Sequence, residues 1–500
     1  MSPARLMTID RWIGDAAAQG PDKPALIFAD ETLSYSDLAQ RIYARAAELE
    51  RAGVARGDRI AWYGLNHPEV FVLLFACARI GAIFVPLNWR LAEAEVAAIV
   101  ADCAPRLMFH DDHFAVAAGR LEGTRAVAVA QPVPGPTRNL APDGREAPGQ
   151  ARGAAEETDP VLLVYTSGAT GRPKGALLTQ KALICNAAMS VEAHGMTRGD
   201  VVLNVLPLFH VGGLNILPTP ALSIGATVLL HERFDPDAAC SALQSVSLAI
   251  TVPTVLQAVM GSDGWVGADL SGLRAVSIGS TDVPAALIRA VHARGVPVIQ
   301  IYGATETGPL AIYQRIGEAF DTVGSIGRAG SRCAIRLMAG GVEAGTGVPG
   351  EIQVKGDNVL REYWHDPELS AQMLQDGWFR TGDVAMRDAD GLFWFTDRIK
   401  HVIISGGENI YPAEIERILR ENPDISEVAV VGRPDAKWGE IPVAVVVARA
   451  ELAAEDVLAP LTGRLARYKH PKDVVFVKTL PRNAMGKVVA GDVRRLITRG

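Results

Sequence analysis

Strand-like and helix-like patterns alternate along most of this chain of 500 residues. Amphipathic periodicity predicts a helix over 35–52, and a continuous apolar pattern predicts a buried helix over 68–80. Short runs rich in β-branched and aromatic residues predict strands at 59–63 and 83–87, and similar strand patterns return at 201–206, 226–230 and 298–302. This alternation of strands and helices indicates an α/β fold with parallel sheets.

Two segments interrupt the alternation. The segment 131–160 is rich in Pro, Gly, Ala and charged residues, and it is predicted to be an exposed connection. The second interruption is near Asp397-Arg398-Ile399-Lys400, after a pattern typical of the end of a hairpin at 391–396. Beyond it the patterns predict a compact α+β unit, with a strand at 402–404, a helix at 412–421 and strands at 425–431 and 442–448. A chain of 500 residues is too long to form a single hydrophobic core. We therefore expect two domains, 1–397 and 398–500.

Bulk composition excludes several function classes. The net charge of −7 argues against a nucleic-acid-binding surface. The five cysteines are scattered without Cys-x-x-Cys spacing, which favours a reducing compartment and argues against a zinc site. The sequence has no apolar run of 18 residues and no signal-peptide pattern after Met1, so we expect a cytoplasmic protein without a transmembrane segment.

One segment favours a specific ligand. The stretch 165–175, Tyr-Thr-Ser-Gly-Ala-Thr-Gly-Arg-Pro-Lys-Gly, follows the apolar run 161–164 and combines hydroxyls, glycines and two cations. Glycines let the main chain turn tightly, and successive N–H groups form an anion-binding nest. A polyphosphate is the expected ligand, although the stretch does not match the Walker A pattern. The alternative interpretation is an ordinary surface turn.

Five further clusters combine small residues with one chemically active side chain. They are Leu206–Gly213 with His210, Tyr302–Gly308 with Glu306, Trp378–Asp383, Ser405–Pro412 and Pro481–Lys487. Singly, each has an ordinary interpretation as a capped turn or a solvated side chain. Together with the 165–175 stretch, and in this order, they resemble the adenylate-forming superfamily over nearly the whole chain. Within that superfamily the chain is most similar to stand-alone acid–CoA ligases.

The resemblance implies an α/β fold, with a large N-terminal domain of doubly wound sheets plus a β-barrel and a small mobile C-terminal α+β domain. It also implies a two-step reaction with ATP, Mg²⁺ and coenzyme A. A carboxylate attacks the α-phosphorus of ATP to give an acyl-adenylate and pyrophosphate, and the thiol of CoA then displaces AMP. The expected partners are therefore a small-molecule carboxylic acid, ATP and CoA, not nucleic acid; a homo-oligomer is left open.

The resemblance assigns roles to individual residues of the nucleotide site. Thr166 to Lys174 matches the segment that holds pyrophosphate, and Glu306 matches the magnesium-associated acid, with Thr166 as a second metal contact. Asp383 and Arg398 match the residues that contact the ribose. The complete set for ATP and AMP is Thr166, Ser167, Gly168, Thr170, Lys174, Ser280, Tyr302, Gly303, Thr305, Asp383 and Arg398.

Catalysis and domain movement are assigned in the same way. Lys487 matches the lysine whose ammonium bridges the attacking carboxylate and the α-phosphate, and with Glu306, His210 and Thr166 it forms the implied catalytic set. Lys400 matches the hinge about which the small domain rotates. The residues implied for CoA are Arg90, Ser405, Gly406, Gly407, Trp438, His470 and Lys472. His470 departs from the pattern, because some relatives have Arg there.

The acyl pocket is expected among 209–216, 251–260, 276–281 and 302–310, with His210 gating it towards the CoA path. Its expected contacts are His210, Val211, Gly212, Asn215, Thr251 and Ala304. Apart from His210 these segments contain no Lys, Arg or His, so a second buried carboxylate would have no cationic partner and dicarboxylic acids are disfavoured. A medium or long fatty acid is favoured slightly, and a hydroxycinnamate-type or other aryl acid is the alternative.

Three other functions fit the sequence less well. A luciferase-like oxygenase is disfavoured because Ile404 stands where luciferases carry a lysine. A peptide-synthetase adenylation domain is disfavoured because 209–215 has no acid for a substrate ammonium. A non-enzymatic nucleotide sensor would not need Glu306, Lys487 and a CoA path together.

Overall fold

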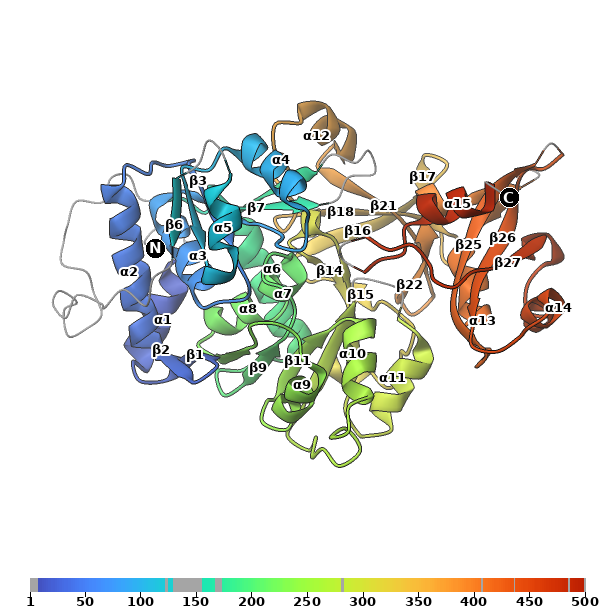
Figure 1. Ribbon diagram of the computed structural model, residues 1–500, viewed down its shortest axis with the longest axis horizontal. Helices are drawn as coiled ribbons and strands as arrows, with labels where there is room; N and C mark the ends of the chain where they lie inside the picture. The colour runs from blue at the N-terminus through green and yellow to red at the C-terminus, as the bar shows by residue number, and fades with distance from the viewer. Residues whose placement is uncertain are drawn as a thin grey trace. The chain divides into compact units, whose positions relative to one another are not determined.

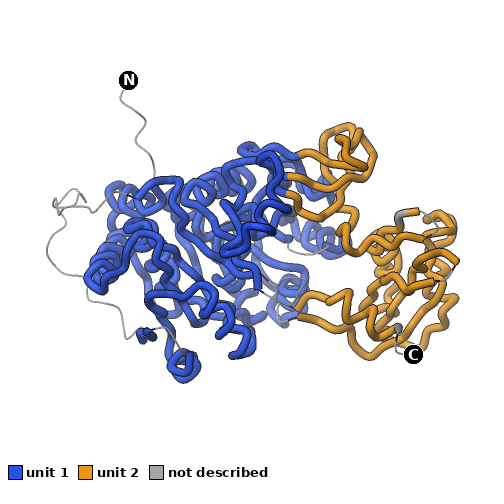
Figure 2. The backbone as a smooth tube through the Cα atoms, turned by 90° about the horizontal axis from the view of Figure 1, so that it is seen from above, with its two compact units in different colours: residues 1–335, 354–379 blue, residues 336–353, 380–500 orange. Residues whose placement is uncertain are grey.

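The computed structural model describes residues 8–121, 125–128, 155–166, 173–279, 283–405, 408–435, 437–483 and 486–498. The chain divides into two compact units, coloured separately in Figure 2. Unit 1 comprises residues 1–335 and 354–379, and unit 2 comprises 336–353 and 380–500. Among the described residues, no helix combines the length and the apolar character needed to cross a membrane.

Unit 1 is built on two large sheets (Figure 1). The nine-stranded sheet is parallel in its middle and antiparallel at both ends. Its strands, in spatial order, are β15 (Arg328–Ala329), β14 (Leu310–Tyr313), β13 (Val298–Gly303), β12 (Ala275–Gly279), β11 (Leu248–Thr251), β9 (Val201–Asn204), β10 (Thr227–Leu230), β1 (Pro24–Phe28) and β2 (Glu31–Ser34). The seven-stranded sheet consists of β19 (Glu362–Tyr363), β8 (Lys174–Thr179), β7 (Pro160–Thr166), β4 (Ile83–Pro86), β3 (Arg59–Tyr63), β5 (Leu107–His110) and β6 (Arg125–Ala128).

Helices connect and cover these strands. They are α1 (Arg11–Gln19), α2 (Tyr35–Arg51), α3 (Glu69–Ile80), α4 (Glu93–Cys103), α5 (Ala115–Gly119), α6 (Gln180–His194), α7 (Val211–Asn215), α8 (Pro218–Ser223), α9 (Pro236–Leu243), α10 (Pro253–Met260), α11 (Ala285–His292) and α12 (Pro367–Met373). A capping box begins α2: the Ser34 hydroxyl accepts from the Asp37 N–H at 3.1 Å, and the Asp37 carboxylate accepts from the Ser34 N–H at 3.0 Å.

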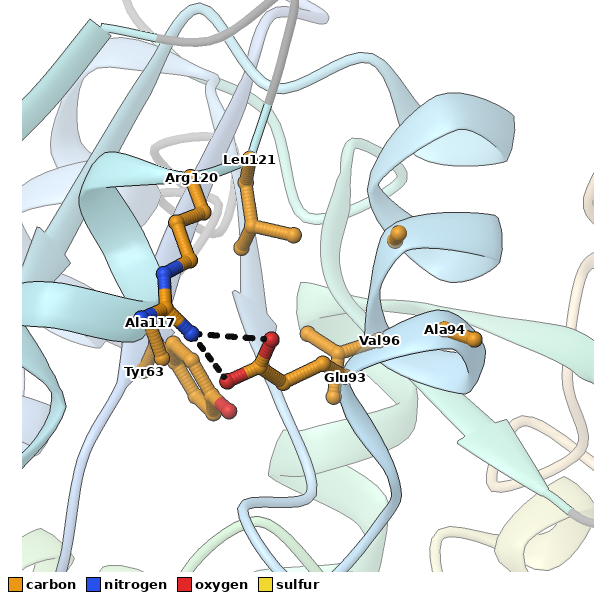
Figure 3. Close-up of a pocket in the computed structure, with 8 residues that line it drawn as sticks. Tyr63, Glu93, Ala94, Val96, Ala117, Arg120 and Leu121 are labelled. Atoms are coloured by element: carbon orange, nitrogen blue, oxygen red, sulfur yellow. Dashed lines mark hydrogen bonds and ion pairs between the residues drawn. The ribbon is translucent and has the colours of Figure 1, made fainter.

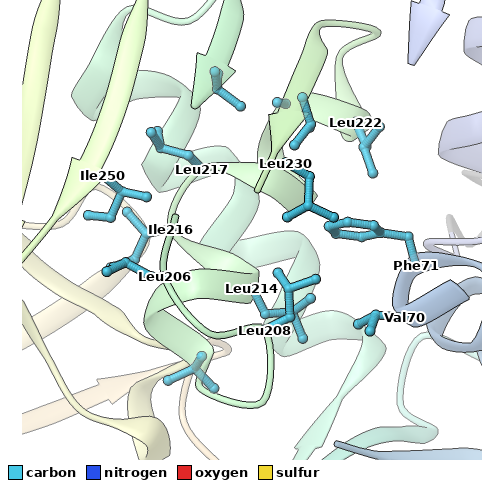
Figure 4. Close-up of a cluster of buried hydrophobic side chains, with 14 of the residues drawn as sticks. Val70, Phe71, Leu206, Leu208, Leu214, Ile216, Leu217, Leu222, Leu230 and Ile250 are labelled. Carbon is cyan, nitrogen blue, oxygen red and sulfur yellow. The ribbon is translucent and has the colours of Figure 1, made fainter. Parts of the chain in front are cut away.

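The core of unit 1 continues from one sheet to the other. Helix α6 contacts β7 and β8 of the seven-stranded sheet and β14 of the nine-stranded sheet. Helix α3 is buried on nearly all sides because almost every residue in it is apolar. Its Val70 and Phe71 lie in one cluster with Leu208, Leu222 and Leu230, as Figure 4 shows. The residues expected to surround the acyl pocket are therefore carried on a continuous hydrophobic core.

Unit 2 contains most of a six-stranded sheet and all of a five-stranded one. The six strands are β17 (Val342–Glu343), β16 (Cys333–Ala339), β18 (Gly350–Gly356), β21 (Trp378–Arg387), β20 (Leu374–Gln375) and β22 (Phe393–Arg398). The five are β24 (Glu408–Ile410), β23 (Ile403–Ser405), β26 (Gly439–Ala448), β25 (Ile425–Asp435) and β27 (Asp473–Phe476). The five-stranded sheet packs with α13 (Pro412–Leu419), α14 (Ala454–Leu458) and α15 (Ala490–Thr498).

The expected α/β class, with a large N-terminal part and a small C-terminal part, is confirmed. Each predicted helix and strand is present with ends displaced by a few residues. The expected connection over 131–160 lies outside the described residues as far as 154, and Pro160 already belongs to β7. The expected domain boundary at 397/398 differs from the division between the two units, and it stays a prediction.

Candidate active site

The polyphosphate stretch connects two adjacent strands of the seven-stranded sheet. Strand β7 ends at Thr166, β8 begins at Lys174, and these two residues are paired in the antiparallel register. The Thr166 hydroxyl donates to the Lys174 carbonyl at 3.5 Å. Ser167, Gly168 and Thr170 lie outside the described residues. The hairpin geometry thus places the hydroxyl of Thr166 and the side chain of Lys174 at the two ends of the same loop.

Glu306 lies beside this hairpin. It belongs to a single turn of 3₁₀-helix, η2 (Thr305–Thr307), that follows β13, and η2 contacts β8. Its Oε1 accepts a hydrogen bond from the Tyr363 hydroxyl at 2.8 Å. Burial, followed by the nearby Glu306 charge, raises the pKa of Tyr363 well above its usual range, so the phenol stays protonated and donates.

Three further residues expected to bind the nucleotide lie in this turn or directly before it. Tyr302 and Gly303 end β13, Tyr302 is buried, and Thr305 begins η2. A Cβ on Gly303 would lie 1.6 Å from the Pro309 carbonyl oxygen, so only glycine fits between β13 and the returning chain. Ser280 lies outside the described residues.

The donor set around Glu306 fits magnesium that arrives with a nucleotide. Among the described residues there is no group of three or more His, Cys, Asp or Glu side chains placed to hold a metal. A single carboxylate beside a phosphate-binding loop suits Mg²⁺, which keeps several waters and is held mainly by substrate phosphates. Glu306 and Thr166 are the residues that would contact it.

Two asparagines hold the loop that carries Glu306. The Asn358 amide donates to the carbonyls of Thr307 at 3.0 Å and Leu310 at 2.8 Å. Asn186 donates to the Asn215 carbonyl at 2.7 Å and accepts from the Leu310 N–H at 3.0 Å. These side chains are buried, so their hydrogen bonds fix the main chain in a region without regular structure.

Two polar residues expected in the acyl pocket are engaged within the protein. The Asn215 amide donates to the Gly308 carbonyl at 3.2 Å, and its oxygen accepts from Thr219 at 2.8 Å. The Thr251 hydroxyl donates to the Ser277 carbonyl at 3.2 Å. Ala304, whose N–H donates to the Thr307 hydroxyl at 2.9 Å, is part of the Glu306 turn.

His210 stands at the N-terminus of α7, before Val211 and Gly212. Its Nδ1 accepts from the Gly212 N–H at 3.0 Å, so the proton of a neutral ring resides on Nε2. The preceding Phe209 meets the Trp89 ring edge-on, with centroids 6.1 Å apart.

Arg90 lies against the same pair of rings. Its guanidinium is 5.0 Å from the Trp89 centroid and 6.0 Å from the Phe209 centroid. Burial lowers the pKa of Arg90, although an arginine remains charged at every relevant pH. The structure therefore places the expected CoA residue Arg90 next to the turn that carries His210.

Four of the residues expected in unit 2 lie around one ion pair. Asp383 and Arg398 face each other across the β21–β22 pair, with 3.0 Å between Arg398 Nε and Asp383 Oδ1. Burial, together with the charges of Arg398 and Lys400 and against that of Asp383, lowers the pKa of Lys487 to about 8. The structure thus brings Lys487 within electrostatic reach of Asp383, Arg398 and Lys400.

A tight turn presents Lys487. The Lys487 N–H donates to Asn483 Oδ1 at 3.0 Å, and the Asn483 N–H donates to the Lys487 carbonyl at 2.9 Å. Gly486, between them, has a φ of +76°, which favours glycine.

The expected hinge residue Lys400 occupies a short 3₁₀ turn, η4 (Ile399–His401), between β22 and β23. The buried Asp397 directly precedes this segment: it accepts from the Arg398 N–H at 2.6 Å and from the Ala413 N–H, near the start of α13, at 2.8 Å.

Three of the residues expected to bind CoA gather at the beginning of β26. Ser405 pairs with Gly439, the neighbour of the half-exposed Trp438, and the Lys472 N–H donates to the Pro442 carbonyl at 2.8 Å. His470 donates from its ring to the Leu465 carbonyl at 3.1 Å. Gly406 and Gly407 lie outside the described residues.

A separate cavity of about 200 Å³ in unit 1 contains no residue of the predicted site (Figure 3). It lies between α4 and α5, where Glu93 and Arg120 form an ion pair with 3.3 Å between Nη1 and Oε1. Its remaining lining is largely apolar, with Tyr63, Val96 and Leu121.

Sequence reasoning missed the residues that hold the site residues in place. Tyr363, Asn358, Asn186, Trp89 and Asp397 are single side chains without a motif. Their partners are up to more than a hundred positions away along the chain, as with Asn186 and Leu310. Their positions therefore follow only from the fold.

Comparison with known proteins identifies the family. Residues 13–364 match the model described as AMP-binding enzyme, and residues 414–487 match the AMP-binding enzyme C-terminal domain. An indoleacetate–CoA ligase of Aromatoleum aromaticum is 47% identical over 99% of both chains. A feruloyl-CoA synthase of an Amycolatopsis species is 40% identical over 97% of this chain and 98% of its own.

Solved structures agree. The o-succinylbenzoate CoA synthetase of Bacillus subtilis, in complex with its acyl-adenylate intermediate, superposes with a TM-score of 0.86 at 29% identity over 98% of this chain and 99% of its own. The chain belongs to the AMP-binding enzyme family, and it is an AMP-forming acid–CoA ligase.

Proposed function

We propose that this ligase uses Mg²⁺·ATP to activate an arylacetic acid of the indole-3-acetate type and transfers the acyl group to CoA. The observation that carries this proposal is the 47% identity, over 99% of both chains, to a relative that is named for indoleacetate. The second relative, at 40%, is named for another aryl acid. Both observations weigh against the fatty acid that the sequence slightly favoured.

The hydrogen bonds around the expected pocket favour an aryl acid without a phenolic hydroxyl. A buried hydroxyl needs a partner, and Asn215 and Thr251 already bond to main-chain carbonyls or to Thr219. On this ground the lining accepts the unsubstituted ring of phenylacetate more readily than ferulate. A medium-chain fatty acid is the second candidate, because the same lining suits an alkyl chain.

Within this function the residues act as follows. The loop from Thr166 to Lys174 holds the phosphates, and Glu306 holds Mg²⁺, which neutralises charge on the phosphates. Asp383 and Arg398 bind the ribose, and Lys487 stabilises the charge that develops as the carboxylate attacks. His210 gates the acyl pocket, and Arg90, Ser405, Trp438, His470 and Lys472 bind CoA.

The test is thioester formation by the purified chain with ATP, Mg²⁺ and CoA across four acids: indole-3-acetate, phenylacetate, ferulate and octanoate. We expect kcat/KM to be highest for indole-3-acetate or phenylacetate, by about 100-fold over octanoate, as differential pocket contacts allow. Indole-3-acetamide, which lacks the carboxylate, is the matched control and must give no pyrophosphate. A highest kcat/KM for octanoate or ferulate would overturn the arylacetate assignment.

A further inference from the structure

Tyr363 is fixed by the strand that follows the phosphate loop. The two-residue strand β19 pairs with β8 in the register Tyr363↔Ala176 and Glu362↔Leu177. Main-chain hydrogen bonds continue on both sides: the Arg361 N–H donates to the Leu177 carbonyl at 2.8 Å, and the Trp364 N–H donates to the Gly175 carbonyl at 2.7 Å. The Tyr363 side chain is only 4% exposed, so it has little freedom to move.

From this position its phenol reaches the carboxylate of Glu306. The hydroxyl donates to Glu306 Oε1 at 2.8 Å. The same segment also holds the main chain of the Glu306 turn, through the Leu360 N–H to the Glu306 carbonyl at 2.7 Å and through Asn358 to Thr307. Leu360 and Asn358 fix where the turn lies, whereas Tyr363 acts on the orientation of the carboxylate itself.

We propose that Tyr363 is a positioning residue that orients the Glu306 carboxylate for the Mg²⁺ of Mg²⁺·ATP. The bond at Oε1 restrains the carboxylate, and Oε2 would then be the oxygen that contacts the metal or its water. Partners of this kind, one step removed from a metal, change metal affinity by about 10- to 100-fold when they are lost. The inference rests on the proposed magnesium role of Glu306 and not on the identity of the acid.

The phenol also ties two parts of the site together. The main chain of Tyr363 belongs to the sheet that carries the Thr166–Lys174 loop. The Tyr363 hydroxyl reaches the turn that follows β13 of the other sheet. The hydrogen bond therefore sets the metal-binding carboxylate in register with the phosphate loop. That is what a metal bridging protein and phosphate oxygens requires.

The variant Tyr363→Phe keeps the ring and removes only the hydroxyl. The primary measurement is equilibrium binding of Mn²⁺, followed by electron paramagnetic resonance, in the presence of a non-hydrolysable ATP analogue. We expect the variant to bind Mn²⁺ about 10-fold more weakly. Pyrophosphate release should need correspondingly more Mg²⁺, and excess Mg²⁺ should restore most of kcat.

Tyr35→Phe is the matched control. Tyr35 is fully buried on α2, and its hydroxyl donates to the Ala226 carbonyl at 2.6 Å, outside the site. It should lower the midpoint of unfolding and leave Mn²⁺ affinity unchanged. A role of Tyr363 in folding alone would make the two variants behave alike, and this would overturn the proposal, as would native Mn²⁺ affinity in Tyr363→Phe.

A second variant tests the role of Tyr363 separately from the magnesium role of Glu306. In a Glu306→Gln background, Tyr363→Phe should change Mn²⁺ affinity no further, since the carboxylate that it orients is gone. Native Mn²⁺ affinity in Glu306→Gln alone would refute the magnesium role of Glu306. The Mn²⁺ titration contains no acid, so an incorrect assignment of the substrate would leave its result intact.

Discussion

At the scale of single residues, the protonation of Lys487 is the property that the surroundings alter most usefully. Burial lowers its pKa to about 8, and Arg398 and Lys400 act in the same direction. Below that pH the amine is the charged ammonium that the adenylation step is proposed to use, and above it the neutral form dominates. Pyrophosphate release should therefore fall as pH rises through about 8, approaching tenfold per pH unit.

The measurement is the pH profile, from pH 7 to 10, of kcat/KM for ATP in pyrophosphate release, because kcat/KM reports the pKa of the free enzyme. Lys487→Arg keeps its charge over this whole pH range, so its profile should not fall at high pH. Its rate of pyrophosphate release should be lower than that of wild type at every pH. Lys487→Ala should reduce adenylation by about 100-fold or more and should form thioester from supplied acyl-adenylate at a near-native rate. Equal loss in both half-reactions would remove Lys487 from its proposed role.

Some site residues lie in sequence motifs that can be recognised, and others do not. Lys487 and Asp383 occupy turns of small residues that can be found in the sequence, and the structure brings them within electrostatic reach of each other. Tyr363 and Asn358 have no such signal, because a lone tyrosine or asparagine has the same local sequence whether it is solvated or buried. Their roles depend on hydrogen bonds to residues about 50 positions away, and only the folded chain shows which partners these are.

At the scale of elements, a buried histidine links α6 to β12. His194 is fully buried; its Nδ1 donates to the Ser190 carbonyl at 2.7 Å, and its Nε2 therefore accepts from the Ser277 hydroxyl at 2.5 Å. Burial lowers the pKa of His194 from 6.5 to about 4; Arg274 also lowers it, while the Ser190 hydrogen bond and Asp200 oppose this. Protonation would reverse the Ser277 bond, with Nε2–H donating to the hydroxyl oxygen, and it would bury a positive charge, so the folded chain favours the neutral ring.

This link predicts acid sensitivity. The unfolded chain takes up a proton at His194 below about pH 6.5, and the folded chain does so only near pH 4, so the stability contribution is complete above 6.5 and is lost as pH falls towards 4. The full effect is about 3 kcal/mol. Urea unfolding at pH 7.5, 6.5 and 5.5 should show wild type losing about 1 kcal/mol per pH unit more than His194→Gln at the acidic end.

The exposed His113 supplies the control, because its side chain is 56% exposed. His113→Gln should reproduce the pH dependence of wild type. Parallel stability curves for wild type and His194→Gln would show that His194 is not the group whose proton uptake opposes folding.

Prediction of elements from the sequence succeeded where periodicity is strong. This holds for the helices over 35–51 and 69–80 and for the strands of the α/β alternation. Their apolar residues recur at the helix or strand period because those positions face the core. Two-residue strands such as β19 lack any period, although β19 is the strand that brings Tyr363 to Glu306. Pairing with an existing strand stabilises such a segment, so its local sequence need not encode a strand.

At the scale of the whole molecule, the division into two units and the expected domain boundary make different predictions about folding. The division falls inside β16, β18 and β21, between residues that belong to one continuous strand. In contrast, two hydrophobic clusters, one including Ile403, Ile415 and Val446 and the other including Val443 and Ile497, consist entirely of residues after 398. A segment with its own core can fold alone.

We therefore expect the fragments 1–397 and 398–500 each to unfold cooperatively in urea, with secondary structure measured by circular dichroism. A fragment ending at 379 should aggregate or unfold without a cooperative transition, because the cut divides β21 and removes most of the strand that pairs with β18. The fragment 380–500 is the matched control for 398–500: its extra residues form the β21–β22 hairpin and should add no stability to the small core. Cooperative unfolding of 1–379, together with failure of 398–500 to fold, would place the boundary inside β21 rather than at the proposed hinge.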